Sequence, residues 1–332
     1  MHFASILVVL TEQCHVGCQH CGYIGSKRDG EVEAPELENW LDQFRQYGIP
    51  EVIFTGGEAF ERYELLCRGV ERARTNGLRS GVFTSAFWAT SQEKARQTLR
   101  ELSGLARLHI STDVYHQKRI PPAYVRHAID AALELGIANI RLAITYATGQ
   151  DKNNISSQFS DYGNRITIYA DRVIPNPKFS PRVLAGQDRL VELSPKSYSR
   201  NCWIGTPLVD PSGEIFACHI GKAAAHRDLT KLPFYLGNLR SSSFATIMKQ
   251  AQERPDYQFL RTHGPRGVAE MACQTPSLLE SLPRREFTTA CDMCMSILKS
   301  EKGADSLRAY AADKRDTINT VLAFRMAEQP LS

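Results

Sequence analysis

The sequence lacks the features that mark membrane, secreted and nucleic-acid-binding proteins. Its N-terminal apolar run, Ile6 to Leu10, is far too short to span a bilayer, and neither the basic segment nor the small-residue cleavage site of a signal peptide accompanies it. Long runs of Lys or Arg are missing and the formal net charge is only +4, so nothing indicates a nucleic-acid partner. We therefore expect a cytoplasmic protein with neither a membrane nor a nucleic-acid partner.

Internal repeats and low-complexity segments are missing as well. An apolar fraction of 42% and a charged fraction of 23% are ordinary for a globular protein. A length of 332 residues allows one large domain and a smaller one.

Cysteine, by contrast, is plentiful. Nine cysteines in a cytoplasmic chain argue against a disulfide scaffold and for metal or redox chemistry. Seven of them fall into two groups with the spacing of metal ligands: Cys14, Cys18 and Cys21, and then Cys202, Cys218, Cys291 and Cys294. Cys67, on the apolar side of an expected helix, and Cys273 remain outside these groups.

The first group lies directly after an apolar segment, residues 5–11, that we predict to be a buried strand. Three thiolates so close together can bind a soft metal site. A fourth cysteine, which a closed zinc site would need, is missing here, and an iron–sulfur cluster held by three cysteines leaves one iron open for another ligand. The alternative is an incomplete zinc site.

Strand and helix patterns alternate through the first half of the chain. The expected strands are 5–11, 52–55, 80–84, 108–112, 140–144 and 165–169. The expected helices are 35–47, 61–75, 91–102 and 122–135, whereas 149–164 is polar and a poor helix candidate. This order predicts parallel β/α units that form a partial (β/α)6 barrel similar to a TIM barrel, with its chemistry at the carboxyl ends of the strands.

The alternation stops after a proline-containing tract, 174–186, which we expect to be a linker. A small α+β domain should follow the barrel. The expected domains are therefore 1–190 for the barrel, 191–300 for an auxiliary metal-binding domain, and 301–332 for a helical tail.

Several polar residues lie where the strands end. Gly56-Gly57-Glu58 follows the second strand, and its glycines allow close approach of the backbone while its carboxylate can accept hydrogen bonds from an ammonium group. Thr84 and Ser85 end the third strand, and Ser111 and Asp113 end the fourth. Asp113 begins a polar cluster with Tyr115 and His116, in which it would act as a general base or merely cap a turn.

The spacing Cys14-x3-Cys18-x2-Cys21 resembles the signature of the radical SAM superfamily. The resemblance implies a [4Fe–4S] cluster whose open iron binds S-adenosylmethionine (SAM), and reductive cleavage of SAM to a 5′-deoxyadenosyl radical. It also implies that Glu58, in Gly56-Gly57-Glu58, holds the methionine amino group and that His20 lies near the adenine. Residues at the positions of Thr84, Ser85 and Ser111 often contact the SAM carboxylate, the ribose or the substrate in this superfamily.

The second cysteine group has four thiolates, a full set for one further [4Fe–4S] cluster. Cys202 and Cys218 flank an expected hairpin around Pro211-Ser212-Gly213, and Cys291 and Cys294 open a helix-like segment. This order resembles the shortened Twitch form of the SPASM extension of radical SAM enzymes, which implies one auxiliary cluster. A structural Cys₄ zinc site fits the same spacing.

The resemblance implies abstraction of a hydrogen atom from a substrate C–H bond, with electrons from an external one-electron reductant such as flavodoxin or ferredoxin. Our main expectation is dehydrogenation or epimerisation of an aminocyclitol or sugar-like small molecule in natural-product biosynthesis, with Asp113 as base or Cys273 as hydrogen donor. Since no peptide-binding domain precedes residue 5, we expect a small substrate or a short peptide. The alternatives are a peptide-modifying maturase that epimerises or cross-links a ribosomal precursor, and a non-catalytic zinc-binding protein.

Overall fold

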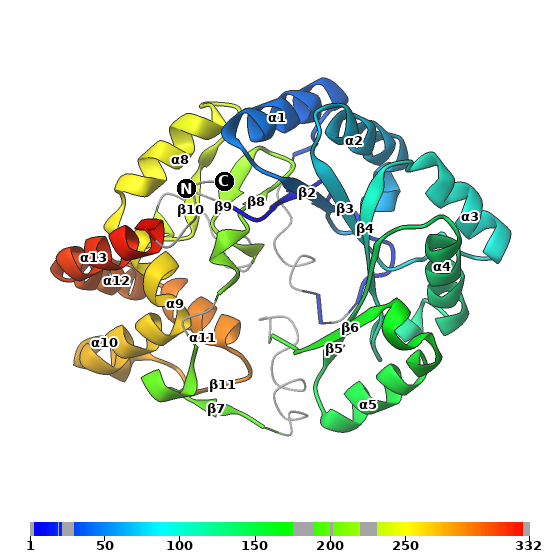
Figure 1. Ribbon diagram of the computed structural model, residues 1–332. Coiled ribbons are helices and arrows are strands. Elements are labelled where there is room, and N and C mark those ends of the chain that lie inside the picture. Colours follow the sequence, from blue (N-terminus) through cyan, green and yellow to red (C-terminus); the bar gives the residue numbers. More distant parts are fainter. Residues whose placement is uncertain are drawn as a thin grey trace. The chain divides into compact units, whose positions relative to one another are not determined.

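The structure is a computed structural model that describes residues 3–18, 20–21, 30–174, 189–199, 202–219 and 231–327 (Figure 1). It divides into two compact units. The barrel unit comprises His2–Arg189 and Leu208–Glu214, and the C-terminal unit comprises Leu190–Pro207 and Ile215–Ser332. All but the first residue of the predicted linker 174–186 lies outside the described residues.

The barrel unit contains six parallel strands, each hydrogen-bonded to the next one along the chain. They are β1 (Ile6–Val9), β2 (Glu51–Thr55), β3 (Arg79–Thr84), β4 (Leu105–Ser111), β5 (Asn139–Tyr146) and β6 (Thr167–Arg172). The short strand β8 (Leu208–Val209) pairs with β1 in parallel, at Leu7 and Val8.

Helices connect these strands and follow their outer side (Figure 1). They are α1 (Ala34–Tyr47), α2 (Tyr63–Thr75), α3 (Gln92–Glu101), α4 (Pro122–Glu134) and α5 (Gly149–Ser157), with the 3₁₀ turns η1 (Ala59–Arg62), η2 (His116–Lys118) and η3 (Ser160–Arg165). Parallel strands joined by helical crossovers confirm the predicted partial (β/α)6 barrel.

Two faces of the strands differ in chemistry. The outward face is apolar, as at Phe54 of β2, which is fully buried and, like Leu37 of α1, lies against Gly69 of α2. The inward face carries polar and aromatic side chains, including an ion pair of 3.1 Å between Arg107 Nη2 and Glu51 Oε1. The alternation of side chains along each strand separates these two environments.

Helix α5 corrects the expectation that 149–164 is a poor helix candidate. A reciprocal capping box starts this helix, in which Thr148 accepts from the backbone of Asp151 and Asp151 accepts from that of Thr148. Ile155 is its buried residue. Capping rather than an apolar stripe therefore identifies this helix.

The C-terminal unit is mainly helical and is centred on α9 (Pro255–Gln274). Its other elements are β7 (Val191–Glu192), η4 (Pro195–Ser197), η5 (Trp203–Gly205), β9 (Glu214–Phe216, which begins at the boundary of the barrel unit), β10 (Tyr235–Asn238), α8 (Phe244–Glu253), α10 (Pro276–Ser281), β11 (Glu286–Phe287), α11 (Ala290–Leu298), α12 (Glu301–Asp313) and α13 (Arg315–Ala327). Strands β7 and β11 pair in antiparallel orientation. Helix α9 breaks at Gly264, where φ is +55° and Pro265 follows.

The tail predicted to be helical forms α12 and α13, which pack against α9. Helix α12 buries Ala304, Leu307 and Ala311. None of the helices in the described parts of the chain combines the length and the apolar composition needed to cross a membrane.

Candidate functional site

The three-cysteine loop begins shortly after β1 and folds onto a small apolar cluster. Cys18 is 7% exposed and lies with Val16 and Ile120, while the half-buried Cys14 and Cys21 pack against the same cluster. Burial raises the pKa of the Cys14 thiol. Three soft sulfur donors on one apolar patch suit an iron–sulfur cluster with one open iron.

Gly56 and Gly57 join the end of β2 to the segment that leads into this loop. The amide of Gly57 donates to the Thr11 carbonyl at 2.8 Å, and that of Glu58 donates to the Gln13 carbonyl at 2.9 Å. A Cβ atom at Gly56 would overlap the Thr11 carbonyl oxygen, and one at Gly57 would overlap that of Gln13. The glycines are thus required for close approach of protein backbone, which holds Glu58 beside the cysteine loop.

Glu58 is buried, and burial raises the pKa of its carboxyl group against the opposing hydrogen bonds from Ser85. Its Oε2 accepts from the Ser85 amide at 2.8 Å and from the Ser85 hydroxyl at 2.6 Å. Its Oε1 accepts a longer bond, 3.3 Å, from the Phe60 amide. Thr84 contacts this carboxylate as well, so a ligand ammonium group would have to share or displace one of these protein hydrogen bonds.

Thr84 and Ser85 lie at a strained turn after β3. The Thr84 hydroxyl accepts from the Ala86 amide and from the Trp88 indole at 2.9 Å, and Ser85 binds Glu58. Ala86 has a φ of +64°, a left-handed conformation that costs a non-glycine residue about 1–2 kcal/mol. Thr84 and Ser85, the two predicted SAM contacts at this turn, therefore both have hydrogen-bond partners within the protein. Through Ser85, the turn holds the Glu58 carboxylate in place.

Asp113 lies at the centre of a buried polar group with two histidines. Its Oδ2 atom is 2.8 Å from His116 Nδ1 and 3.5 Å from His20 Nε2, and its Oδ1 atom accepts from the amides of Tyr115 and His116. The carboxylate is 1% exposed. These contacts give Asp113 the capping geometry that was one of its two predicted roles.

The two histidines of this group differ in charge. Burial lowers the pKa of His20 to about 4, whereas hydrogen bonds to Asp113 and Cys18 outweigh burial and raise the pKa of His116 to about 10. The His20 ring lies 4.6 Å from the Tyr115 ring. Ser111, the remaining predicted residue, ends β4 half-buried and opposite Ala143.

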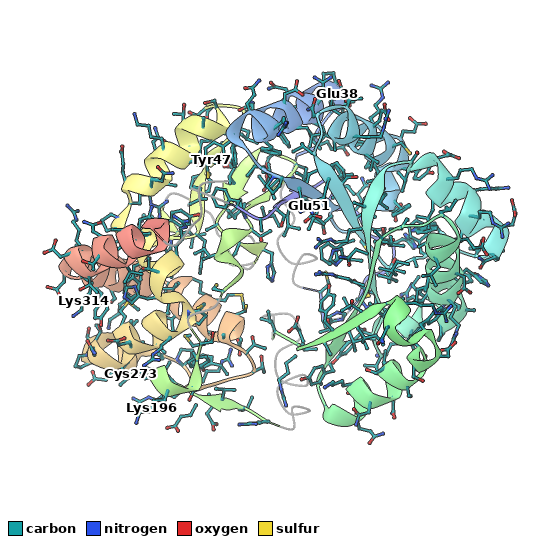
Figure 2. All side chains as sticks on the ribbon, in the orientation of Figure 1. Glu38, Tyr47, Glu51, Lys196, Cys273 and Lys314 are labelled. Atoms are coloured by element: carbon teal, nitrogen blue, oxygen red, sulfur yellow. The ribbon has the colours of Figure 1, made fainter. Side chains whose placement is uncertain are left out.

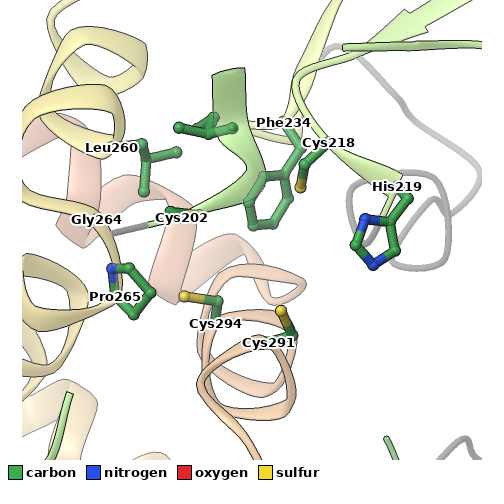
Figure 3. A pocket seen from close by; sticks show the side chains of 10 residues that line it. Cys202, Cys218, His219, Phe234, Leu260, Gly264, Pro265, Cys291 and Cys294 are labelled. Atoms are coloured by element: carbon green, nitrogen blue, oxygen red, sulfur yellow. The ribbon is translucent and has the colours of Figure 1, made fainter. Parts of the chain in front are cut away.

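The four cysteines of the second group line one pocket of the C-terminal unit (Figure 3). Cys291 and Cys294 come from α11, Cys202 precedes η5 and Cys218 follows β9. The other lining residues are largely apolar: Ile204, His219, Phe234, Leu260, Gly264 and Pro265. Burial raises the pKa of the Cys294 thiol well above its usual value, and the three other cysteines add to the increase.

The spacing of these four sulfurs bears on how a single zinc ion would fit among them. A tetrahedral zinc with Zn–S bonds of about 2.3 Å places its sulfurs about 3.8 Å apart. Within the described residues, the one set of three ligand atoms that lie within 4.8 Å of one another is that of Cys18, His20 and His116. No three of the four pocket cysteines, all of which the structure describes, bring their sulfurs within this limit, so a zinc ion would need them to move closer.

Asp292, between the two cysteines of α11, was not singled out from the sequence. It is fully buried and binds the Arg284 guanidinium through both oxygens, one of them at 2.8 Å from Nη1. Asp292 also accepts from the Thr288 amide at 2.9 Å. This ion pair fixes the start of α11, and no local sequence signal connects Arg284 with it.

Cys273 lies apart from the four-cysteine pocket, exposed near the end of α9 (Figure 2). Its sulfur is 3.8 Å from the Leu193 carbonyl oxygen, and burial of the sulfur raises the pKa of the thiol. The four cysteines predicted as ligands of the auxiliary cluster therefore lie together, and Cys273 is not among them. Cys67 is half-buried on α2.

Comparisons with known proteins agree with this geometry. Residues 8–156 match the profile described as "Radical SAM superfamily". The chain is 22% identical over 321 residues to "Putative peptide biosynthesis protein YydG" of Bacillus subtilis (strain 168), which covers 93% of this chain and 97% of that protein. It is 31% identical over 151 residues to "GTP 3′,8-cyclase" of Synechococcus elongatus, which covers 43% of this chain and 44% of the cyclase.

Among solved structures, the chain resembles "Native anSMEcpe with bound AdoMet and Kp18Cys peptide". The TM-score is 0.53 at 12% identity, over 95% of this chain and 99% of that chain. At this identity the likeness shows a shared fold along nearly the whole of both chains.

Proposed function

We propose, from the radical SAM domain that residues 8–156 match, that the protein modifies a residue of a peptide by abstracting a hydrogen atom. One observation supports the peptide: the similarity to the peptide biosynthesis protein extends over 97% of that protein, whereas the similarity to the cyclase covers 44% of the cyclase. This proposal replaces the aminocyclitol or sugar-like substrate of our main expectation.

In this proposal Cys14, Cys18 and Cys21 hold a [4Fe–4S] cluster that binds SAM at its open iron. When reduced by flavodoxin or ferredoxin, cluster and SAM together supply the means to abstract hydrogen from an unactivated C–H bond. Glu58 binds the methionine ammonium group, since its carboxylate lies buried beside the cysteine loop. His20 faces the adenine.

The residues around Glu58 and His20 act as positioning groups in this proposal. Ser85 orients the Glu58 carboxylate through two hydrogen bonds. Asp113 orients His116 and His20 rather than serving as general base, because its oxygens already receive four contacts and its carboxylate is 1% exposed. Ser111 remains a candidate for substrate or ribose contact at the end of β4.

We assign the second cysteine group to an auxiliary [4Fe–4S] cluster. Four thiols, a full ligand set for one cluster, and a largely apolar pocket support this assignment. Cys273 remains a candidate hydrogen donor, which would make the reaction an epimerisation.

The test compares substrates directly. The reconstituted enzyme, SAM and dithionite in heavy water are incubated with synthetic peptides encoded by short reading frames of the source cell, and in parallel with aminocyclitols. We expect 5′-deoxyadenosine above the substrate-free background with a peptide only. A peptide that gains one deuterium indicates epimerisation, and one that loses two hydrogens indicates cross-linking or dehydrogenation.

The variant Cys14→Ala/Cys18→Ala/Cys21→Ala serves as the inactive control for this test. Stimulation by an aminocyclitol and by none of the peptides would overturn the peptide assignment. The same deuterium gain in Cys273→Ala would remove Cys273 as the hydrogen donor and leave the peptide assignment intact.

A further inference from the structure

One donor set, formed by the three-cysteine loop and the turn η2, is not explained by cluster binding. The ligand atoms of Cys18, His20 and His116 all lie within 4.8 Å of one another, and Cys14 and Cys21 do not belong to this set. A zinc ion with bonds of about 2.0–2.3 Å to nitrogen and sulfur needs its ligands slightly closer than this limit. Small side-chain rotations would bring the three atoms onto one ion.

The surroundings of both rings complete the donor set. His116 Nδ1 and His20 Nε2 both face Asp113 Oδ2, at 2.8 and 3.5 Å. His116 also hydrogen-bonds to Cys18, so a metal would take the place of that contact, and His20 Nδ1 is a buried atom without a hydrogen-bond partner among the described residues. The side chain of His20 is nine-tenths buried. Ligating histidines usually bind a carboxylate through their other nitrogen, as His116 does here, while His20 approaches the same carboxylate.

We propose that the cluster-free protein binds one zinc ion through Cys18, His20 and His116, with water as the fourth ligand and Asp113 as the shared outer partner. Three protein ligands and an open position are a common zinc arrangement. Since Cys18 is also a proposed cluster ligand, zinc and the cluster exclude each other. Zinc would therefore block cluster assembly at the site of radical chemistry, whichever substrate the enzyme takes.

The choice of ligands makes this proposal distinct from zinc binding by the three cysteines. The full-length protein is freed of iron anaerobically and titrated with Zn²⁺ against a chromophoric chelator. The variant Cys291→Ala/Cys294→Ala supplies the background, because the second cysteine group binds zinc too if its sulfurs move closer. We expect one equivalent, which Cys18→Ala abolishes and which Cys14→Ala and Cys21→Ala retain.

Replacing the histidines should weaken the zinc affinity more than replacing the carboxylate does. Asp113→Asn should weaken it about 10–100-fold, the usual effect of removing an outer partner, and His20→Ala and His116→Ala should weaken it further. The matched control on the same loop is His15→Ala, because His15 pairs with Glu61 outside the set and its replacement should leave the affinity unchanged. Unchanged affinity in both His20→Ala and His116→Ala would overturn the proposal.

A second measurement uses the unaltered chain and needs no variant to fold. Zn²⁺ is added to the iron-free protein before alkylation, and the modified cysteines are mapped by mass spectrometry. We expect protection of Cys18 while Cys14 and Cys21 react. Equal protection of all three would assign the zinc to the cysteines instead, and would leave the proposed cluster and peptide chemistry untouched.

Discussion

The two cysteine groups of this chain are constructed in opposite ways. The first draws three cysteines from one loop, which folds onto a small apolar cluster and has titratable side chains such as His116, Asp113 and Glu58 nearby. The second draws four cysteines from three segments into a pocket lined mainly by apolar side chains. An incomplete donor set among polar groups suits a ligand that binds and reacts, and a complete set in apolar surroundings suits a group that stays bound.

The largest expected effect comes from removing each group in turn. After anaerobic reconstitution we expect about eight irons in the wild type and about four in Cys14→Ala/Cys18→Ala/Cys21→Ala, which should form no 5′-deoxyadenosine. Cys291→Ala/Cys294→Ala should also lose about four irons but still form some 5′-deoxyadenosine, because the first group is intact. Bound zinc and only about four irons in the wild type would reduce the comparison to one cluster and one structural ion.

The second expected effect concerns the scaffold of the four-cysteine pocket. Asp292→Ala leaves the Arg284 guanidinium without its buried partner, so we expect a loss of about 3–5 kcal/mol in the free energy of unfolding. Iron at the second site should fall as well, because Asp292 fixes the start of α11. The control Asp305→Ala removes an exposed ion pair with Arg308 and should cost less than about 1 kcal/mol in urea unfolding. Equal losses in both variants would contradict the role of Asp292.

The third expected effect tests how the barrel site is held together. Gly57→Ala places a Cβ atom against the Gln13 carbonyl, so we expect a loss of up to about 3 kcal/mol in stability. Displacement of Glu58 from the cysteine loop should slow 5′-deoxyadenosine formation about 100-fold. Gly205, in the C-terminal unit, has open space where its Cβ atom would lie, so Gly205→Ala should change stability by less than about 0.5 kcal/mol. A fully active Gly57→Ala enzyme would show that the activity does not depend on this close approach of the two backbones.

The smallest expected effect is a pH dependence specific to the barrel interior. Burial, with the nearby Arg107 and Arg141, lowers the pKa of His109 from 6.5 to about 3. The unfolded chain therefore binds a proton below pH 6.5 that the folded barrel does not, and this contribution to stability is lost as the pH falls from about 6.5 to 3. Between pH 7 and 5 the wild type should lose about 2 kcal/mol that His109→Gln does not lose.

The measurement for His109 is urea unfolding at both pH values. The aromatic neighbours Phe83, whose ring lies 4.1 Å from that of His109, and Tyr169 bring no charge that would reverse the sign. Equal pH slopes for wild type and His109→Gln would show that this histidine is not responsible for the acid sensitivity of the barrel.

Sequence patterns predicted the barrel well because its strands and most of its helices are defined by burial. Helix α1, for example, buries Leu37, Trp40, Leu41 and Phe44 at helical spacing and ends at Gly48 with a φ of +90°. Helix α5 was missed because a capping box, and not an apolar stripe, defines it.

The ligand cysteines could also be chosen from spacing alone, since thiols at ligand spacing carry a chemical meaning without the fold. The contacts around these cysteines could not be predicted in this way. The hydrogen bond between His116 and Cys18, and that between Arg284 and Asp292, join residues on different elements, and only the packing of those elements brings them together. The strained Ala86 likewise follows from the geometry that holds Ser85 on Glu58.

The contact between Gly57 and the segment before Cys14 has a mechanical consequence. Two backbone hydrogen bonds tie the loop after β1 to the loop after β2, so the start of the cysteine loop and the backbone of Glu58 are held together as one piece. Main-chain geometry thus fixes where the backbone of Glu58 lies relative to the start of the cysteine loop, and the side-chain rotamers set the rest of the distance between the two proposed ligand-binding groups. Evolution can therefore exchange the side chains around this piece to suit new substrates without altering the backbone separation on which cofactor binding depends.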